Sequence, residues 1–223
     1  MDFSLLSKYG IDSLPSKTVR EAHEAIRSAA EMGFPVAMKI ISPGALHKSE
    51  KGGVLLGIQS AHEAEAAYRT LMGRFKGAKV EGVLVQKMYI SPSETHQTLS
   101  GSRFVPMAGN GAIELIIGGK RDSQFGQLIM LGMGGIFVEV YKDVTFRVCP
   151  IKKEDALEMI SELKARPILE GARGRKPIDK SALVRALLSV SRLLQKENPS
   201  EFDINPLMAD EKGCVAVDMR ILY

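Results

Sequence analysis

Short apolar runs, separated by glycine and proline, recur along the chain. The clearest is 36–41 (VAMKII), which is apolar except for one lysine and ends at a Ser-Pro-Gly turn. A run of this length with such boundaries favours a buried strand over a helix. The same reasoning predicts strands at 54–58, 82–88, 112–117, 127–131, 136–141, 144–148, 202–207 and 215–219.

Apolar residues spaced three and four apart predict helices between several of these strands. The helical segments are 20–32, 60–75, 155–165 and 179–196. Ser60 stands three residues before Glu63, which is the pattern of a capping box. Asp179 or Ser181 is expected to cap the last helix, and Gly33 is a natural residue to end the first. The apolar stripes of these helices are expected to face the core.

One stretch shows neither the pattern of a strand nor that of a helix. Residues 89–111 are largely polar and contain Ser, Thr, Pro and Gly. A stretch of about 20 residues without regular structure is uncommon inside a compact domain, and is usually a functional loop or a disordered insert. We therefore expect this segment to lie outside the core.

The composition is typical of a globular protein. Of the 223 residues, 45% are hydrophobic and 25% are charged, which argues against a disordered chain. No apolar run reaches 18 residues, and the first ten residues lack the pattern of a signal peptide. We therefore expect a cytoplasmic protein without a membrane partner. Cys149 and Cys214 lie far apart, which fits two reduced thiols better than a disulfide framework or a zinc site.

The charge pattern argues against nucleic-acid binding. Thirty basic and 26 acidic residues give a net charge of +4, but the basic residues are dispersed and tryptophan is absent. A nucleic-acid surface would combine a basic stripe with aromatic stacking positions. A mild positive excess suits a small anionic ligand, such as a nucleotide, equally well.

Two glycine-containing segments resemble phosphate-binding loops without matching them. Residues 44–49 (GALHKS) lack the second glycine that a P-loop needs before its Lys-Ser pair. Residues 132–135 (GMGG) lack the spacing of a dinucleotide-binding fingerprint. Neither fold is therefore predicted.

Lys39 and His47 are the first candidates for chemistry. Lys39 interrupts an apolar strand, where a charge must be paired, face a ligand such as phosphate, or reach solvent along its stem. His47 follows in a loop rich in glycine and lysine, where an imidazole could meet an anion or only order the loop. The sequence leaves both interpretations open for each residue.

The last two predicted strands hold a second candidate site. Residues 202–207 and 215–219 could pair as an antiparallel hairpin with its turn at 210–213, which places Asn205 beside Asp218. An amide oxygen and a carboxylate, completed by phosphate oxygens, are a usual way to hold Mg²⁺. An acidic hairpin rim without a metal would show the same pattern.

Taken together, these segments resemble a known family. The matching stretches, in order, are FPVAMKIISPGALHKSEKGGV, GVLVQKM, ELIIGGKRDSQFGQLIMLGMGGIFVEVYKDVTFRVCPI, ILEGARG, EFDINPL and VAVDMR. They are similar to the ATP-grasp module of the ADP-forming acyl-CoA synthetases, such as acetate–CoA ligase, and most of all to its separate beta subunit. The resemblance implies an α+β ATP-grasp fold, in which an N-terminal lobe at 1–80 and a C-terminal lobe at 81–223 clamp a nucleotide.

The chain departs from this family in two places. The stretch at 89–111 is atypical of the family and follows directly after the expected adenine hinge. Gln127 stands where proline is usual, a change that we expect to matter little.

The resemblance also implies roles for individual residues. Lys39 would contact the nucleotide phosphates, and Glu114 would lie in the nucleotide pocket near the ribose. Gln86, Lys87 and Met88 would form the hinge that holds adenine through backbone groups.

Three further residues complete the implied machinery. Asn205 and Asp218 would bind Mg²⁺, and His47 would be the catalytic residue, which carries a phosphoryl group transiently. A neutral imidazole is available as a nucleophile near pH 7, where lysine mostly is not.

The implied reaction is acyl-CoA + ADP + phosphate ⇌ carboxylate + CoA + ATP, with Mg²⁺ as cofactor and ATP or ADP as substrate. The partner would be a CoA-binding alpha subunit that carries the first phosphohistidine, in a heterotetramer of two alpha and two beta subunits. Two other interpretations stay open: another ATP-grasp carboxylate ligase, which would need neither the partner nor His47, and a non-catalytic nucleotide-sensing subunit.

Overall fold

The computed structural model describes residues 3–42, 52–90, 112–134 and 142–223. These residues belong to two compact units. The first unit is Leu14–Tyr89, without the loop 43–51, and the second contains the described residues before Leu14 and after Tyr89. The expected strand at 136–141, His47 and nearly all of the aperiodic stretch lie outside the described residues.

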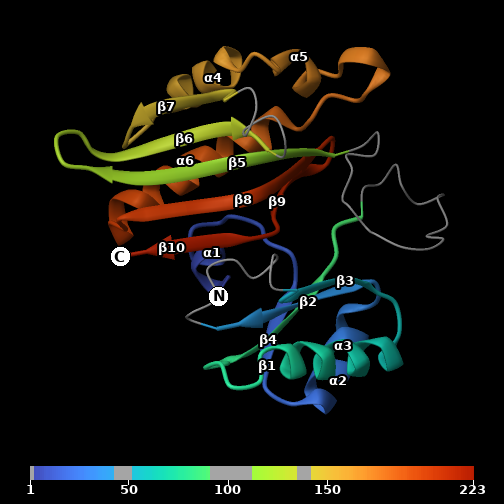
Figure 1. Cartoon of the computed structure of the whole chain (residues 1–223). Coiled ribbons are helices and arrows are strands. Elements are labelled where there is room, and N and C mark those ends of the chain that lie inside the picture. The colour runs from blue at the N-terminus through green and yellow to red at the C-terminus, as the bar shows by residue number, and fades with distance from the viewer. Residues whose placement is uncertain (1–2, 43–51, 91–111, 135–141) are drawn as a thin grey trace. The chain divides into compact units, whose positions relative to one another are not determined.

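The first unit is an antiparallel sheet with helices packed against one face (Figure 1). In chain order it contains β1 (Ser16–Val19), α2 (Ala22–Met32), β2 (Val36–Ile41), β3 (Val54–Ile58), α3 (Ala61–Arg74) and β4 (Gly82–Lys87). The strand order is β1-β4-β2-β3. β4 pairs with both β1 and β2, so the boundary that we expected near residue 80 falls before a strand that belongs to this unit.

Local signals mark the start of α3 and the end of α2, as the sequence predicts. The hydroxyl of Ser60 accepts the backbone N–H of Glu63 at 3.2 Å and caps α3. The Glu63 carboxylate accepts the N–H of Gln59 at 2.9 Å, one residue before the partner that the capping box implies. Gly33 ends α2 with a φ of 72°, a conformation that glycine adopts without strain.

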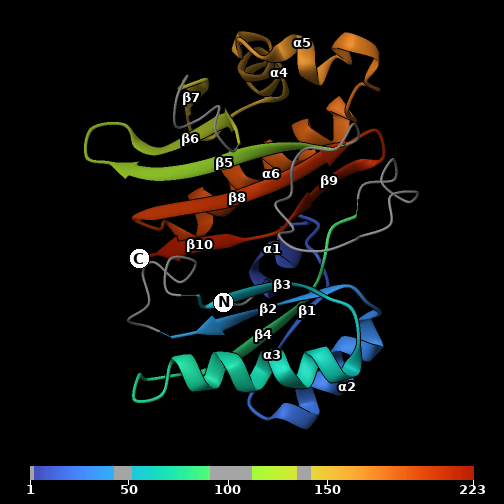
Figure 2. The same ribbon diagram turned by 45° about the vertical axis from the view of Figure 1, so that its right-hand side comes forward.

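The second unit is a larger antiparallel sheet with helices on one face (Figure 2). Its elements are α1 (Ser4–Lys8), β5 (Ile113–Asp122), β6 (Gly126–Met133), β7 (Val144–Val148), α4 (Lys153–Glu162), α5 (Arg166–Leu169), the 3₁₀ turn η2 (Ala172–Gly174), α6 (Lys180–Glu197), β8 (Glu201–Asp210), β9 (Gly213–Ala216) and β10 (Met219–Leu222). The strand order is β10-β8-β5-β6-β7, and β9 also pairs with β8. The carboxylate of Asp179 accepts the N–H of Ala182 at 3.0 Å and caps α6, as one of the two expected residues.

Two expectations for this unit need correction. The strand expected at 215–219 is wrong, because the chain leaves the extended ladder at Val217 and Asp218 between β9 and β10. The helix expected at 155–165 ends at Glu162, because the buried carboxylate of Asp143 accepts the backbone amides of Lys164 and Ala165, just beyond that end, at 2.8 and 2.9 Å. The short α1 of this unit, like β1 of the first unit, has no expected counterpart.

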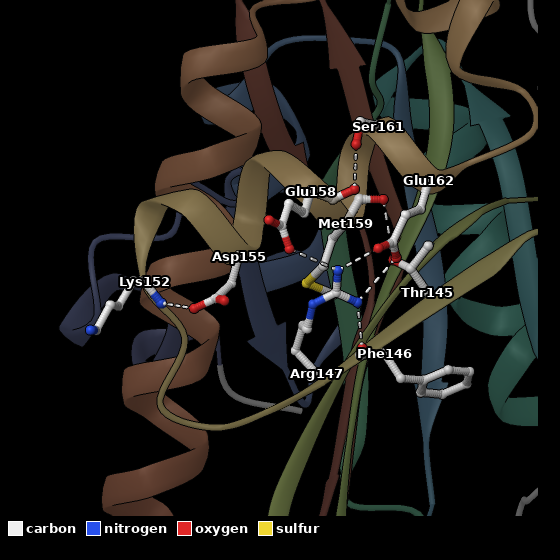
Figure 3. Close-up of polar contacts among 9 residues, drawn as sticks. All are labelled: Thr145, Phe146, Arg147, Lys152, Asp155, Glu158, Met159, Ser161 and Glu162. Atoms are coloured by element: carbon white, nitrogen blue, oxygen red, sulfur yellow. Dashed lines mark hydrogen bonds and ion pairs between the residues drawn. The ribbon is translucent and has the colours of Figure 1, made fainter.

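A polar network holds α4 against β7 (Figure 3). The guanidinium of Arg147 on β7 donates to both carboxylate oxygens of Glu162, at 2.5 and 3.0 Å, and to Glu158 at 3.4 Å. The neighbouring Thr145 donates its hydroxyl proton to the Met159 carbonyl of α4 at 3.3 Å. Thr145 and Arg147 therefore point toward α4, and the alternation of the strand turns Phe146 to the opposite face of the sheet, where it is 55% exposed.

Gln127 has a larger structural role than expected. It is buried, and its amide nitrogen donates to the side-chain oxygen of Asn198 at 2.9 Å and to the carbonyl of Pro199 at 2.8 Å. Asn198 is the left-handed residue that ends α6. A proline at position 127 could not make these bonds, so this side chain secures the turn from α6 to β8.

The cysteines are free, as expected, and their surroundings disfavour the thiolate form of both. Burial raises the pKa of Cys149, and it raises the pKa of Cys214 to about 12, with the carboxylates of Asp179 and Asp210 adding to the effect. Across the described ranges, no helix combines the length and the hydropathy needed to cross a bilayer.

Candidate functional site

Lys39 lies on the face of the first sheet that points away from the helices. Its neighbours Met38 and Ile40 are buried in the core with α2 and α3, and side chains alternate along a strand. The Lys39 side chain is half-buried, so its charge is neither fully solvated nor part of the apolar core. This position suits an amine that meets a ligand over the sheet.

Gln86 shares that face. It stands opposite Ala37 in the β2–β4 ladder, and Lys39 stands opposite Leu84. Residues opposite one another in a ladder point to the same side, so Gln86 and Lys39 lie over the same surface. Gln86 is buried there, with 1% of its surface exposed. The structure thus brings together two of the residues expected to bind nucleotide.

Lys87 and Met88 form contacts that the sequence does not predict. Their backbone N–H groups donate to the carbonyls of Pro15 and Pro35, at 2.9 and 3.2 Å. The sulfur of Met88 accepts the N–H of Gly57 at 3.1 Å. These two N–H groups are therefore engaged within the unit, and a base held by this segment would have to meet other backbone groups, such as its carbonyls.

The described residues on either side of the segment 43–51 pair with one another beside Lys39. Lys39 pairs with Val54 in the β2–β3 hairpin, and the N–H of Ile40 donates to the carbonyl of Gly53 at 2.8 Å. His47 itself lies outside the described residues. Its assignment as a phosphoryl carrier stays a prediction.

Glu114 lies on the face of the second sheet opposite α6. A Cβ placed on Gly119, five positions further along β5, would collide with Leu194 of α6 at 2.4 Å, so the odd positions of the strand face the helix and Glu114 faces away. Burial raises the pKa of the half-buried Glu114 carboxyl. A Cβ on Gly134 would lie 2.8 Å from the Cβ of Glu114, so only glycine fits above this residue.

Asn205 and Asp218 are neighbours, as the hairpin register predicts. The N–H of Asn205 donates to the carbonyl of Asp218 at 3.1 Å, and the N–H of Val217 donates to the carbonyl of Pro206 at 3.0 Å. Asn205 directly follows the buried Ile204, and Asp218 directly precedes the buried Met219, which stands opposite Ile204 in the β8–β10 ladder. The predicted juxtaposition is confirmed, and the break in the ladder frees the backbone at Asp218 from strand geometry.

Asp203 is a site residue that the sequence did not single out. It lies two positions before Asn205 on the same face and stands opposite Arg220 of β10. Burial raises the pKa of its carboxyl, Arg220 opposes that rise, and Asp218 adds to it. The alternation of polar and apolar residues in 201–205 already places Asp203 among the polar positions. It indicates a site residue only once Asp218 is known to lie nearby.

The donor set fits a hard divalent cation. Mg²⁺ is usually bound by one or two carboxylates together with substrate phosphate oxygens. Asn205 offers an exposed amide oxygen, Asp218 a half-buried carboxylate, and Asp203 a nearby negative charge. These residues could hold Mg²⁺, which would supply neutralisation of phosphate charge when bound.

This arrangement defines the class of protein. A family model described as an ATP-grasp domain matches residues 2–222, so the chain belongs to the ATP-grasp family. The α+β ATP-grasp fold expected from the sequence is confirmed.

Relatives narrow the class to one group of ligases. The chain is 43% identical over 223 residues to the beta subunit of ADP-forming acetate–CoA ligase I of Pyrococcus furiosus, which covers 98% of this chain and 88% of that subunit. ADP-forming acetate–CoA ligase I of Archaeoglobus fulgidus is 41% identical over 222 residues, but the match spans 98% of this chain and only 30% of that protein. The chain is thus a homologue of ADP-forming acetate–CoA ligase beta subunits, and the resemblance inferred from the sequence is confirmed.

Solved structures agree with this assignment. Acetyl-coenzyme A synthetase 1 of Ca. Korarchaeum cryptofilum, in complex with coenzyme A, Ca-AMPCP and HgCl⁺, aligns with a TM-score of 0.85 at 38% identity and covers 98% of this chain and 89% of its own. The same protein with coenzyme A and Mg-AMPPCP, its phosphohistidine segment pointing towards the nucleotide-binding site, aligns with a TM-score of 0.78 at 38% identity and covers 97% and 87%. This relative therefore binds a nucleotide analogue with magnesium.

Proposed function

We propose that this chain is the nucleotide-binding beta subunit of an ADP-forming acyl-CoA ligase, with the overall reaction acyl-CoA + ADP + phosphate ⇌ carboxylate + CoA + ATP. The observation that carries the proposal is the 43% identity to such a beta subunit over nearly the whole of both chains. The shared sheet face of Lys39 and Gln86, and the juxtaposition of Asn205 and Asp218, support it.

The described residues divide the work of phosphoryl transfer. Such transfer depends mainly on positioning and on neutralising charge. Lys39 offers a positive charge to the nucleotide phosphates, and Asn205 with Asp218 holds Mg²⁺. The segment Gln86–Met88 binds the adenine, and Glu114 lies near the ribose.

His47 is the proposed phosphoryl carrier. Its imidazole nitrogen attacks the phosphorus of the partner's phosphohistidine, and the N–P bond of that residue breaks as the new one forms. A terminal oxygen of ADP then attacks the phosphorus on His47, which forms ATP and restores the free imidazole. A relay of this kind divides one long transfer into two short ones.

The subunit requires a CoA-binding alpha partner. The Archaeoglobus fulgidus relative supports this, because a domain like this chain is there part of a protein more than three times as long. We propose a heterotetramer of two alpha and two beta subunits in the cytoplasm. The acyl group is left open because its pocket would belong to the partner.

Reconstitution with the partner tests the function. The CoA-binding subunit that copurifies with this chain is added back, and ATP formation from acetyl-CoA, ADP and phosphate is measured for each subunit and for the complex. Turnover by the complex alone is expected. Ligation by this chain alone would indicate another ATP-grasp carboxylate ligase, and nucleotide binding without turnover would indicate a sensing subunit.

A further inference from the structure

The Lys87 side chain lies on the helix face of the first sheet, away from Lys39. Val83 and Val85 of β4 are in the core with α2 and α3, and Lys87 continues the same alternation. Gln86 and Lys39 occupy the other face. The amine of Lys87 is therefore on the wrong side of the sheet to share a phosphate ligand with Lys39.

The amine instead meets the end of α2. Its nitrogen donates to the carbonyl of Gly33 at 2.7 Å and to that of Phe34 at 3.1 Å, and the side chain is half-buried. Gly33 is the residue that ends α2, where the backbone carbonyls lack helical partners and a positive charge is favourable. Two carbonyl acceptors also offset the cost of taking the ammonium group partly out of water.

This contact is one of a set that fixes the hinge. The N–H of Met88 donates to Pro35, which follows Phe34 directly, and the N–H of Lys87 donates to Pro15 on the other side. The end of β4 is thus tied to the α2–β2 turn by one side chain and one amide. A base held by backbone groups can be bound tightly only if that backbone is already in place, because ordering it on binding costs affinity.

We propose that Lys87 is a positioning residue, which ties the hinge Gln86–Met88 to the C-terminal end of α2 and so presets the backbone that recognises the nucleotide base. This inference rests on the proposed function, because it takes the hinge to be the base-binding segment. The role differs from the backbone contact expected from the sequence, since here the side chain acts on the nucleotide only through the hinge.

The test compares Lys87→Met, Lys87→Arg and Lys79→Met in the reconstituted complex. Lys87→Met keeps the length of the side chain and removes its donors, whereas arginine restores donors that can span two carbonyls. Lys79→Met removes one exposed positive charge from the same unit and controls for weaker attraction of the anionic nucleotide. KM for ADP, KM for GDP and kcat are measured for each.

We expect Lys87→Met to raise KM for ADP by about threefold to tenfold, less than the full loss of charge-assisted hydrogen bonds because the side chain acts on the nucleotide only through the hinge, with kcat nearly unchanged. The ratio of KM for GDP to KM for ADP should also change, because a displaced hinge alters base recognition. Lys87→Arg should return both values toward wild type, and Lys79→Met should match wild type.

Two results would overturn the inference. One is a Lys87→Met enzyme with wild-type KM values. The other is an equal rise in KM for ADP and GDP that arginine does not reverse, which would indicate a direct effect on the phosphates. Should Lys87→Met fail to fold, as judged by circular dichroism, Lys87→Gln with its single amide donor group takes its place. A wild-type complex that neither binds ADP nor turns over would refute the proposed function itself, and the inference with it.

Discussion

Asp218 is the residue on which magnesium binding depends most directly. Its carboxylate carries the formal charge of the Asn205–Asp218 pair, and it already accepts the N–H of Met219 at 2.9 Å. Asp218→Ala should leave the fold intact, since the residue lies at a break between strands, but it should remove the magnesium-dependent part of nucleotide binding.

Thermal unfolding of the isolated chain measures this effect. A ligand at about 100 times its Kd stabilises a protein by about 2.7 kcal/mol, so the wild-type melting temperature should rise more with Mg-ADP than with ADP and EDTA. That difference should vanish in Asp218→Ala and persist in Glu154→Ala, which removes an exposed carboxylate from α4. A difference of wild-type size in Asp218→Ala would mean that the metal site is assigned wrongly.

For Gln127 we predict an effect on stability rather than on function. Gln127→Leu keeps the site filled but leaves the Asn198 oxygen and the Pro199 carbonyl without this donor. Loss of a buried donor costs about 1–3 kcal/mol, so the free energy of unfolding should fall by that amount in urea titrations. Gln124→Leu, at an exposed position in the β5–β6 turn, should change it by less than about 0.5 kcal/mol.

At the scale of elements, α4 depends on Arg147 for its attachment to β7. Arg147→Met removes the bonds to Glu158 and Glu162 and should lower the melting temperature by about 2 °C at pH 7, the size expected for a partly exposed ion pair. Arg166→Met breaks an exposed pair between the start of α5 and Glu170, the residue that follows this helix, and should have a smaller effect.

The Arg147 effect should depend on pH in a defined direction. The hydrogen bond from Arg147 is the main cause that lowers the pKa of Glu162 in the folded chain. A carboxyl with a depressed folded pKa stabilises the fold above its unfolded pKa, about 4.3, and loses that contribution as pH falls through the folded value. The difference in melting temperature between wild type and Arg147→Met should therefore shrink below about pH 4. A constant difference from pH 7 to pH 3 would assign the effect to packing alone.

At the scale of the whole molecule, the relay through His47 connects this chain to its partner. His47→Asn keeps some capacity for hydrogen bonding and removes the nucleophile. The reconstituted variant complex should still form the partner's phosphohistidine from acyl-CoA and phosphate but should make almost no ATP, with both species followed by ³²P labelling. Near-normal ATP formation would show that phosphate passes directly from the partner to ADP.

Local sequence patterns predicted most elements and part of the site. The apolar run at 36–41 became β2, Ser60 and Asp179 cap their helices, and the hairpin register put Asn205 beside Asp218. These features depend on the period of apolar residues and on contacts a few residues apart. The resemblance to a family added the roles, since spacing alone left a metal site and an acidic rim equally open.

Tertiary structure decided what depends on distant partners. Lys87 donates a hydrogen bond to a carbonyl 54 residues away, and Gln127 donates one to a side chain 71 residues away. Neither role could therefore be predicted from the neighbouring residues in the sequence. Asp143 likewise stops α4 by taking amides that a helical pattern would have kept within the helix. The sequence by itself determined which residues alternate and where the capped helices α3 and α6 begin. Only the fold decided which face of a sheet each side chain occupies and which buried polar group finds a partner. Burial makes an unpaired donor or acceptor costly, and the partner that satisfies it can come from a segment far away in the sequence.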